Sequence, residues 1–280
     1  MLRSLYYLRR SFPQALERAL TRCWYQYLSR MDREGNMLFM NYGWADLDLM
    51  VSQIPLDAED EANRYCIQLY HHVAAAVDLA GLDVLEVGTG RGGGASYIAR
   101  YLKPRSMVGL DVTQGAIRFC SDRYHVANLS FVRGDAESLP FDDASFDAVV
   151  NIESSHCYRS MERFLAGVCR VLRPNGYFLF ADHRERSEFD ALRGQLRDTG
   201  MTLLREQTIT PNVLRALDLD NARKRKLIEA NVPRVLQGIF CEFAGMTGTR
   251  GVYARFVRGD KEYFSFVLQK RGGPAQDTSS

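Results

Sequence analysis

The stretch VLEVGTGRGGG at residues 84–94 decides the fold, because an apolar, strand-like run passes there directly into a series of glycines. The helical stretch ASYIARYL follows it. In open α/β sheets, ligands lie beyond the carboxyl ends of the strands, and glycines let a ligand approach the backbone closely. Gly88, Gly90 and Gly93 satisfy the pattern GxGxxG, which is typical of dinucleotide sites but is a weak indication by itself. The sequence therefore predicts a ligand site after this strand.

Strand-like and helical stretches alternate over residues 64–183, which predicts an α/β core: a mainly parallel, Rossmann-like sheet with helices on both faces. Residues 1–63 are helical and aromatic, and we expect them to pack over the ligand site. Residues 184–258 predict a helical cap that includes a sixth strand. The final strand, EYFSFVLQK, lies within 259–270, and 271–280 is expected to be a disordered tail.

Composition and charge exclude several classes of protein. The chain has 280 residues and a net charge of +2, so bulk charge gives no reason to expect a nucleic-acid binder. Its six cysteines include no CxxC pair, which favours reduced thiols in the cytosol, and no metal is implied. A secretory signal is not expected, because the basic start lacks a long apolar core, and the sequence has no apolar run of about 18 residues that could span a bilayer. A cytoplasmic location is expected.

An amphipathic helix is predicted from Leu16, where apolar residues recur at helical spacing. The first interpretation docks this helix on the protein's own core. The alternative rests it on a membrane surface, which would make the protein peripheral to the membrane.

Three features shift the expected ligand from a dinucleotide to S-adenosylmethionine. Glu86 stands in an otherwise apolar strand end, where a charge needs a polar partner such as a cationic amino group. Asp111 ends the second strand, where a carboxylate can accept hydrogen bonds from ribose hydroxyls. Asp135 and Ala136 follow the third strand at the same edge, and a carboxylate with a backbone amide suits an adenine edge.

The ordered motifs EVGTGRGGG, GLD, GDAESLPF, FDAVVNIESSHCY and VLRPNGYFLFAD resemble those of class I S-adenosylmethionine-dependent methyltransferases. Within that superfamily, LYHHVA, ESSHCY and RFLAGVCRVLRPNGYF are similar to the phthiotriol/phenolphthiotriol dimycocerosate methyltransferases and related polyketide O-methyltransferases. The resemblance implies a seven-stranded sheet with an antiparallel last strand, and a helical cap that shapes the substrate pocket.

The same resemblance assigns residues to parts of the cofactor. It gives the methionine end to Glu86, Gly88 and Gly90, the ribose to Asp111, and adenine to Asp135 and Ala136. Tyr42 and Trp44, in NYGW, resemble an aromatic segment that closes over the cofactor, and their π faces would favour a positive sulfur. The alternative is that both rings belong to the core.

The polar stretch NIESSHCY at 151–158 follows the fourth strand and is predicted to form the rim where the methyl group is transferred. His156 is the expected general base, since neutral histidine can take a proton near pH 7, and Asp182 orients it or holds the acceptor hydroxyl. Glu153 is the second candidate for the base. Cys157 is not expected to be a nucleophile, because direct transfer needs no covalent enzyme intermediate. His183 is either a second base or a departure from the family that puts the substrate in doubt.

We expect the acceptor to be a hydrophobic small molecule, such as a polyketide or lipid, because the cap segment 236–256 is rich in apolar side chains. The basic run 223–226 predicts a solvated helix face, with docking to a carrier protein or an anionic membrane as the alternative. O-methylation with His156 as base is the first hypothesis. Methylation at carbon, a nicotinamide-dependent oxidoreductase, and a non-catalytic binder or cyclase stay open, and so does the oligomeric state.

Overall fold

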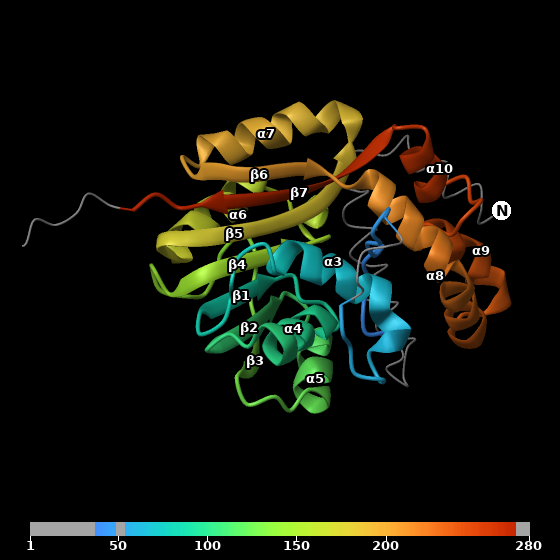
Figure 1. Ribbon diagram of the computed structural model, residues 1–280, viewed down its shortest axis with the longest axis horizontal. Coiled ribbons are helices and arrows are strands. Elements are labelled where there is room, and N and C mark those ends of the chain that lie inside the picture. Colours follow the sequence, from blue (N-terminus) through green and yellow to red (C-terminus); the bar gives the residue numbers. More distant parts are fainter. Residues whose placement is uncertain (1–36, 49–53, 273–280) are drawn as a thin grey trace, which may run out of the picture.

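The computed structural model describes residues 37–48 and 54–272, and in them one sheet of seven strands has the order β3-β2-β1-β4-β5-β7-β6 (Figure 1). β7 pairs antiparallel with β5 and β6, whereas the pairs among β1 to β5 are parallel. The strands are β1 (Asp83–Val87), β2 (Ser106–Asp111), β3 (Leu129–Arg133), β4 (Phe146–Ile152), β5 (Leu172–Glu185), β6 (Thr202–Thr208) and β7 (Lys261–Gln269). This confirms the predicted Rossmann-like fold with an antiparallel last strand.

Helices cover both faces of the sheet (Figure 1). One face packs against α3 (Arg64–Ala74) and α4 (Gly93–Tyr97), which continues as a π-helical turn over Ile98–Leu102. The other face packs against α6 (Met161–Val171) and α7 (Phe189–Asp198). The remaining core helix, α5 (Gln114–Arg123), lies beside β2 and β3. Short 3₁₀ turns cover Glu61–Asn63, Ser155–Cys157 and Arg186–Glu188.

β1 shows why a continuous apolar run folds as a central strand. Val84 packs into the core on the α3 side of the sheet, and Leu85 and Val87 pack into the core on the α6 side. Because side chains alternate along a strand and helices cover both faces, Val84, Leu85 and Val87 are all apolar although they point to different sides. Glu86 points to the same side as Val84, toward α3.

β7 follows the same alternation but brings its first residues to the ligand edge of the sheet. Its antiparallel register pairs Lys261 with Glu185 and Tyr263 with His183, at the carboxyl end of β5. Tyr263 packs on the α3 side, and Phe264 and Phe266 pack on the α6 side. A parallel last strand would instead bring its final residues to this edge.

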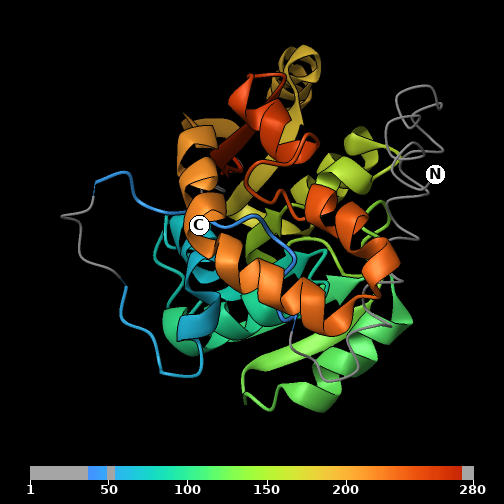
Figure 2. The ribbon, with the colours of Figure 1, turned by 90° about the vertical axis from the view of Figure 1, so that its right-hand side faces the viewer.

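The cap consists of α8 (Thr210–Asn231), α9 (Arg234–Phe243) and α10 (Val252–Val257), and it covers the carboxyl edge of the parallel strands (Figure 2). Pro233 separates α8 from α9, since proline cannot continue the hydrogen-bond ladder of a helix. Residues 37–48 run between this cap and the core. The N–H of Ala45 donates to the carbonyl of Asn212 on α8 at 3.2 Å, and the N–H of Trp44 donates to the carbonyl of Tyr65 on α3 at 2.9 Å.

The basic run on α8 corrects the sequence interpretation of a solvated face. Arg225 and Lys226 are exposed, but Arg223 turns inward to Asp220, and the ammonium of Lys224 donates to the carbonyl of Tyr42 at 3.2 Å. Lys224 therefore links the cap to segment 37–48, and Arg223 links it to Asn63 at the start of α3.

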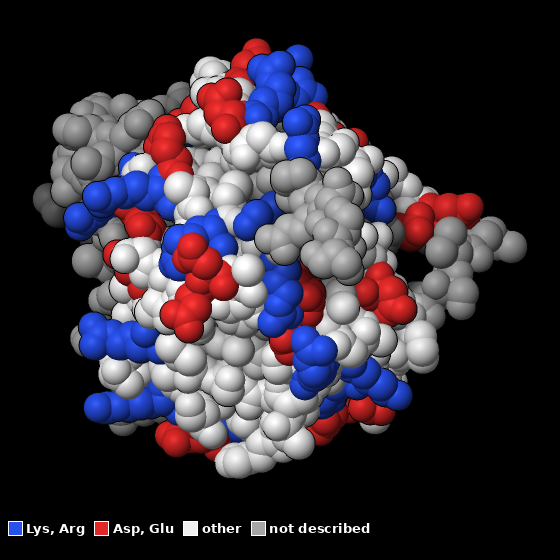
Figure 3. Space-filling view, turned by 90° about the vertical axis from the view of Figure 1, so that its left-hand side faces the viewer, with Lys and Arg blue, Asp and Glu red and all other residues white. Residues whose placement is uncertain are grey.

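The surface carries both signs of charge in close mixture, as the face in Figure 3 shows. No helix in the described ranges has the length and apolar character needed to cross a membrane. The amphipathic helix predicted from Leu16 and most of the predicted tail lie outside the described residues.

Candidate active site

The glycine turn after β1 is shaped for close approach. Gly88 has φ +82°, and a Cβ atom there would lie 1.9 Å from the Ser154 hydroxyl oxygen. Gly90 has φ +54°, and its Cβ would lie 2.7 Å from the terminal methyl of Met40. Any larger residue at Gly88 would therefore both strain the backbone and displace the loop after β4.

A cleft with about 1250 Å³ of empty space, its open mouth included, lies over this turn. Residues 38–41 and Tyr70 form one wall, and the ends of β2, β3 and β4 form the other. Six of the residues predicted for the site line it: Gly88, Gly90, Asp111, Asp135, Ala136 and Glu153. Glu86, Tyr42, Trp44, His156 and Asp182 are not part of its lining.

Asp111 stands at the carboxyl end of β2, inside the cleft. Its two oxygens accept the backbone N–H groups of Gly90 at 3.0 Å and Thr113 at 2.8 Å. Burial raises the pKa of Asp111, and these two amides oppose the rise. The carboxylate thus fixes the glycine turn while it also faces the cleft. Asp135, farther along, accepts the N–H of Glu137 at 2.9 Å.

The buried carboxylate of Glu86 has hydrogen-bond partners within the protein. One oxygen accepts the hydroxyl of Tyr70 at 2.7 Å and the other accepts that of Thr89 at 2.5 Å. Burial raises its pKa, and these two hydroxyls lower it. Its arrangement fixes the start of the glycine turn and the wall residue Tyr70, and its predicted contact with the methionine amino group stays a prediction.

The two aromatic residues of NYGW have different surroundings. The ring of Trp44 stacks on His72 with centroids 5.0 Å apart and belongs to the core on the α3 side. Tyr42 lies closer to the site: its N–H donates to Glu153 at 2.7 Å, and its ring is tilted against His183 at 5.5 Å. The structure therefore groups Tyr42, but not Trp44, with the polar residues after β4 and β5.

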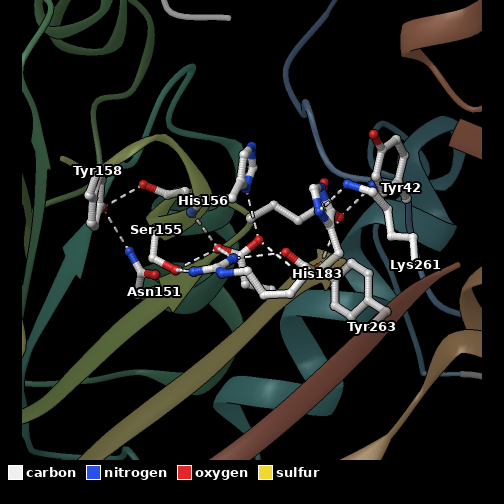
Figure 4. Close-up of polar contacts among 12 residues, drawn as sticks. Tyr42, Asn151, Ser155, His156, Tyr158, His183, Lys261 and Tyr263 are labelled. Carbon is white, nitrogen blue, oxygen red and sulfur yellow. Dashed lines mark hydrogen bonds and ion pairs between the residues drawn. The ribbon is translucent and has the colours of Figure 1, made fainter. Parts of the chain in front are cut away.

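Asp182, near the end of β5, is buried and bonds several polar neighbours. Three of these neighbours, Ser155, His156 and His183, are labelled in Figure 4. The oxygens of Asp182 accept the Ser155 hydroxyl at 2.6 Å, the backbone and ring N–H groups of His156 at 2.9 and 2.8 Å, and the backbone N–H of His183 at 2.8 Å. The guanidinium of Arg184 lies 3.0 Å away. Burial alone would raise the pKa of Asp182, but His156 and Arg184 outweigh it and hold the pKa well below its ordinary value.

The predicted pair of His156 and Asp182 is thus brought together. Since a carboxylate can only accept, the Nδ1 atom of His156 carries the proton of the shared bond. Burial lowers the pKa of His156, but Cys157 and Asp182 raise it, to about 10. A histidine with this pKa is protonated at pH 7.

His183 stacks on His156 with ring centroids 4.4 Å apart. The ammonium of Lys261 lies 3.0 Å from its Nδ1 atom, so Nδ1 accepts and the ring is neutral. Burial lowers the pKa of His183 well below its ordinary value, and Lys261 adds to this effect. The same burial lowers the pKa of Lys261 to about 8.

His156, Asp182 and His183 offer donor atoms within 4.8 Å of one another, a spacing that could hold a metal ion. Both oxygens of Asp182 already accept several donors, however, and Nδ1 of His183 accepts from Lys261. These atoms serve the hydrogen-bond cluster, and we assign no metal to them.

Glu153 lines the cleft together with Ile152, Ser154, Cys157 and Tyr158, and it is the one carboxylic acid in NIESSHCY. It has φ +47°, a left-handed conformation that is uncommon outside glycine and concentrates at functional sites. Its Oε1 atom accepts the N–H of Tyr42 at 2.7 Å and the hydroxyl of Tyr263 at 2.9 Å. Its Oε2 atom accepts from no residue in the described ranges. Burial raises the pKa of Glu153 to about 7, although these two donors oppose the rise.

Sequence reasoning missed Tyr263, Lys261 and Tyr70. The alternation of EYFSFVLQK gives the face on which Tyr263 lies but does not say which strand end meets the ligand. Tyr70 stands on α3, where an aromatic at helical spacing reads as core.

Comparisons with known proteins agree with this geometry. Residues 85–180 match the methyltransferase domain family. The phthiotriol/phenolphthiotriol dimycocerosates methyltransferase of Mycobacterium tuberculosis is 44% identical over 238 residues, 85% of this chain and 87% of that protein. The fatty-acid O-methyltransferase of Mycolicibacterium smegmatis is 43% identical over 247 residues, 88% of each chain.

Among solved structures, a putative sarcosine dimethylglycine methyltransferase from Galdieria sulphuraria has the same fold, with a TM-score of 0.66 at 14% identity, over 86% of this chain and 98% of that one. The fold and the sequence match together define a Rossmann-like methyltransferase. More narrowly, the chain belongs to the family of the phthiotriol/phenolphthiotriol dimycocerosate methyltransferases. The oxidoreductase alternative is thereby removed.

Proposed function

We propose that this enzyme transfers a methyl group from S-adenosylmethionine to an oxygen atom of a hydrophobic, lipid-type acceptor. One observation supports the proposal: a single cleft is lined by the glycine turn, by Asp111 and by Glu153, whose Oε2 atom accepts no hydrogen bond from the described residues. A nucleotide-type site and a proton acceptor thus share one cleft.

The residues of the cleft fit the cofactor. The turn at Gly88 and Gly90 provides a cradle that a Cβ atom would fill. Asp111 presents a carboxylate to the same space, as a ribose requires, and Ala136 offers an apolar surface beside it. When bound, S-adenosylmethionine supplies an electrophilic methyl group. The contribution of the chain is to hold the reactants in line, which can supply roughly 7–11 kcal/mol, and to accept a proton.

The names of the relatives support the acceptor class. They specify phthiotriol/phenolphthiotriol dimycocerosates in one case and a fatty acid in the other. In this chain, the apolar side chains Ile239 and Phe243 of α9 are only partly buried. Such a cap suits an apolar acceptor. Contact with a carrier protein or a membrane, and a cytoplasmic location, stay predictions.

Two groups compete for the role of base. A general base must be unprotonated at the working pH and within reach of the acceptor. His156 is held by Asp182, has a pKa of about 10 and does not line the cleft. Glu153 lines the cleft, has a pKa of about 7 and keeps one oxygen open. These observations favour Glu153 as the base and His156 as the charged partner of Asp182.

The proposal is tested by incubating the protein with labelled S-adenosylmethionine and a panel of long-chain alcohols, fatty acids, phenols and isoprenoids. We expect label in a methyl ether or methyl ester. Label in a new carbon–carbon bond would establish the C-methylation alternative instead. Cofactor binding without product from any member would favour the non-catalytic binder or cyclase.

A further inference from the structure

Tyr263 is a fully buried tyrosine near the carboxyl end of β5, and the proposed methyl transfer assigns it no role. It enters from β7, and its register partner is His183 on β5. Its hydroxyl donates to Oε1 of Glu153 at 2.9 Å across 110 residues of sequence, and its N–H donates to the Thr210 hydroxyl at 2.8 Å. Tyr263 is thus held by hydrogen bonds at its hydroxyl and at its backbone. Because the side chain is inaccessible, it reaches the cleft only through Glu153.

The hydrogen bond from Tyr263 makes the two carboxylate oxygens of Glu153 inequivalent. Oε1 accepts two donors, Tyr263 from β7 and the Tyr42 N–H from segment 37–48, whereas Oε2 remains for a ligand. The left-handed backbone at Glu153 is secured by its own N–H, which donates to the carbonyl of Ala181 at 2.9 Å. The carboxylate is therefore fixed by its backbone and by one oxygen, and only the other oxygen can act on an acceptor.

Charged and titratable groups surround this carboxylate from every neighbouring element. Asp182 and His156 act on it from β5 and the turn after β4, with opposite signs. Lys224 on α8 and Tyr70 and Cys66 on α3 interact with it electrostatically. None of these groups donates a hydrogen bond to the Glu153 carboxylate among the described residues, so Tyr263 is the one side chain there that stabilises its charged form by direct contact.

We propose that Tyr263 is a positioning residue that orients Glu153 as the base and sets the pH range in which its carboxylate is charged. This inference rests on the proposed function. A donor that bonds the charged form of a carboxyl lowers its pKa, so removal of the hydroxyl must raise the pKa of Glu153. Loss of one charge-assisted hydrogen bond corresponds to a shift of about one unit.

The first test is Tyr263→Phe, with pH profiles of kcat/KM. With a pKa of about 7, half of the wild-type Glu153 is charged at pH 7. A rise of about one unit would lower activity about fivefold at pH 7 and let it recover toward the wild-type value at pH 9. A uniform loss at every pH, or an unshifted acid limb, would overturn the proposal.

A second readout needs no turnover. Isotope-edited infrared titration of the protonated Glu153 carboxyl, assigned with Glu153→Gln, reports its pKa directly. The pKa should be higher in Tyr263→Phe than in the wild type, and equal values would overturn the proposal. Tyr177→Phe, at the opposite end of the neighbouring strand β5, is the matched control and should leave the pKa unchanged.

Replacement of Tyr263 by 3-fluorotyrosine keeps the ring and makes the hydroxyl a stronger donor. The acid limb and the infrared pKa should then move to lower pH, the opposite direction from Tyr263→Phe. This variant decides the question if Tyr263→Phe fails to fold. If the wild type methylates no acceptor, the proposed function fails, while the infrared titration still tests the link between Tyr263 and Glu153.

Discussion

The two ends of the cleft are built differently. The end with Gly88, Gly90 and Asp111 consists of short turns after β1 and β2, held mainly by backbone groups. At the other end, the Glu153 carboxylate is held by a backbone N–H of segment 37–48 and by a tyrosine hydroxyl of β7, through hydrogen bonds across more than a hundred residues of sequence. A local turn can serve one cofactor with many acceptors, whereas the second end must be assembled for a particular chemistry.

The largest effect is expected from replacing Asp182, which holds together the polar residues beside Glu153. Asp182→Asn keeps the shape of the side chain but turns an amide toward donors and leaves Arg184 and His156 as uncompensated buried charges. We expect a loss of about 3–5 kcal/mol in the free energy of unfolding. Denaturant unfolding measures it, with the exposed Asp122→Asn as control.

The pH dependence of this loss has a definite sign. Because the pKa of Asp182 is depressed in the folded protein, its stabilisation is complete above the unfolded value of about 3.9 and is lost as the pH falls toward the folded value. The gap between wild type and Asp182→Asn should therefore narrow below about pH 4. A gap that is independent of pH would contradict the charged cluster.

Glu153→Gln tests whether the assembled end carries the chemistry. It removes the proton acceptor but preserves the side-chain volume, and we expect turnover to fall roughly 100-fold. Affinity for the product S-adenosylhomocysteine, measured by calorimetry, should stay within about twofold, since the glycine turn is unchanged. If His156→Gln abolishes turnover while Glu153→Gln does not, the base has been assigned to the wrong residue.

Asp111→Asn probes the local end and should have the smallest effect. It weakens the acceptor of the Gly90 and Thr113 amides. Affinity for S-adenosylhomocysteine should fall about tenfold, the value of one hydrogen bond to a charged group. Turnover at saturating cofactor should be nearly unchanged. Intact affinity would mean that Asp111 shapes the turn without serving the ribose.

The fold and the local end of the cleft could be predicted because their causes are local. The run of β1 carries apolar side chains toward both faces of the sheet, because helices cover both faces. Asp111 is the last residue of its own strand, β2. Trp44 could not be placed, because an aromatic residue suits a core and a cofactor equally well. Its stacking on His72 depends on α3 rather than on its own neighbours in sequence.

The directions of the side chains in NIESSHCY could not be predicted from sequence for a different reason. Alternation along β4 predicts side-chain directions only as far as Ile152, because Glu153 turns to φ +47° and breaks the strand period. After this turn, Glu153 faces the cleft and His156 turns to Asp182. The charge on His156 likewise depends on a carboxylate 26 residues away.

The antiparallel direction of β7 has a consequence for synthesis on the ribosome. Every residue that lines the cleft has been translated once Tyr158 is made, but the hydroxyl that anchors Glu153 arrives 110 residues after Glu153 itself. A nascent or truncated polypeptide that ends before β7 contains the whole nucleotide cradle and still lacks that anchor. The described lining of the cleft is thus encoded before residue 159, whereas the anchor of Glu153 is encoded on β7.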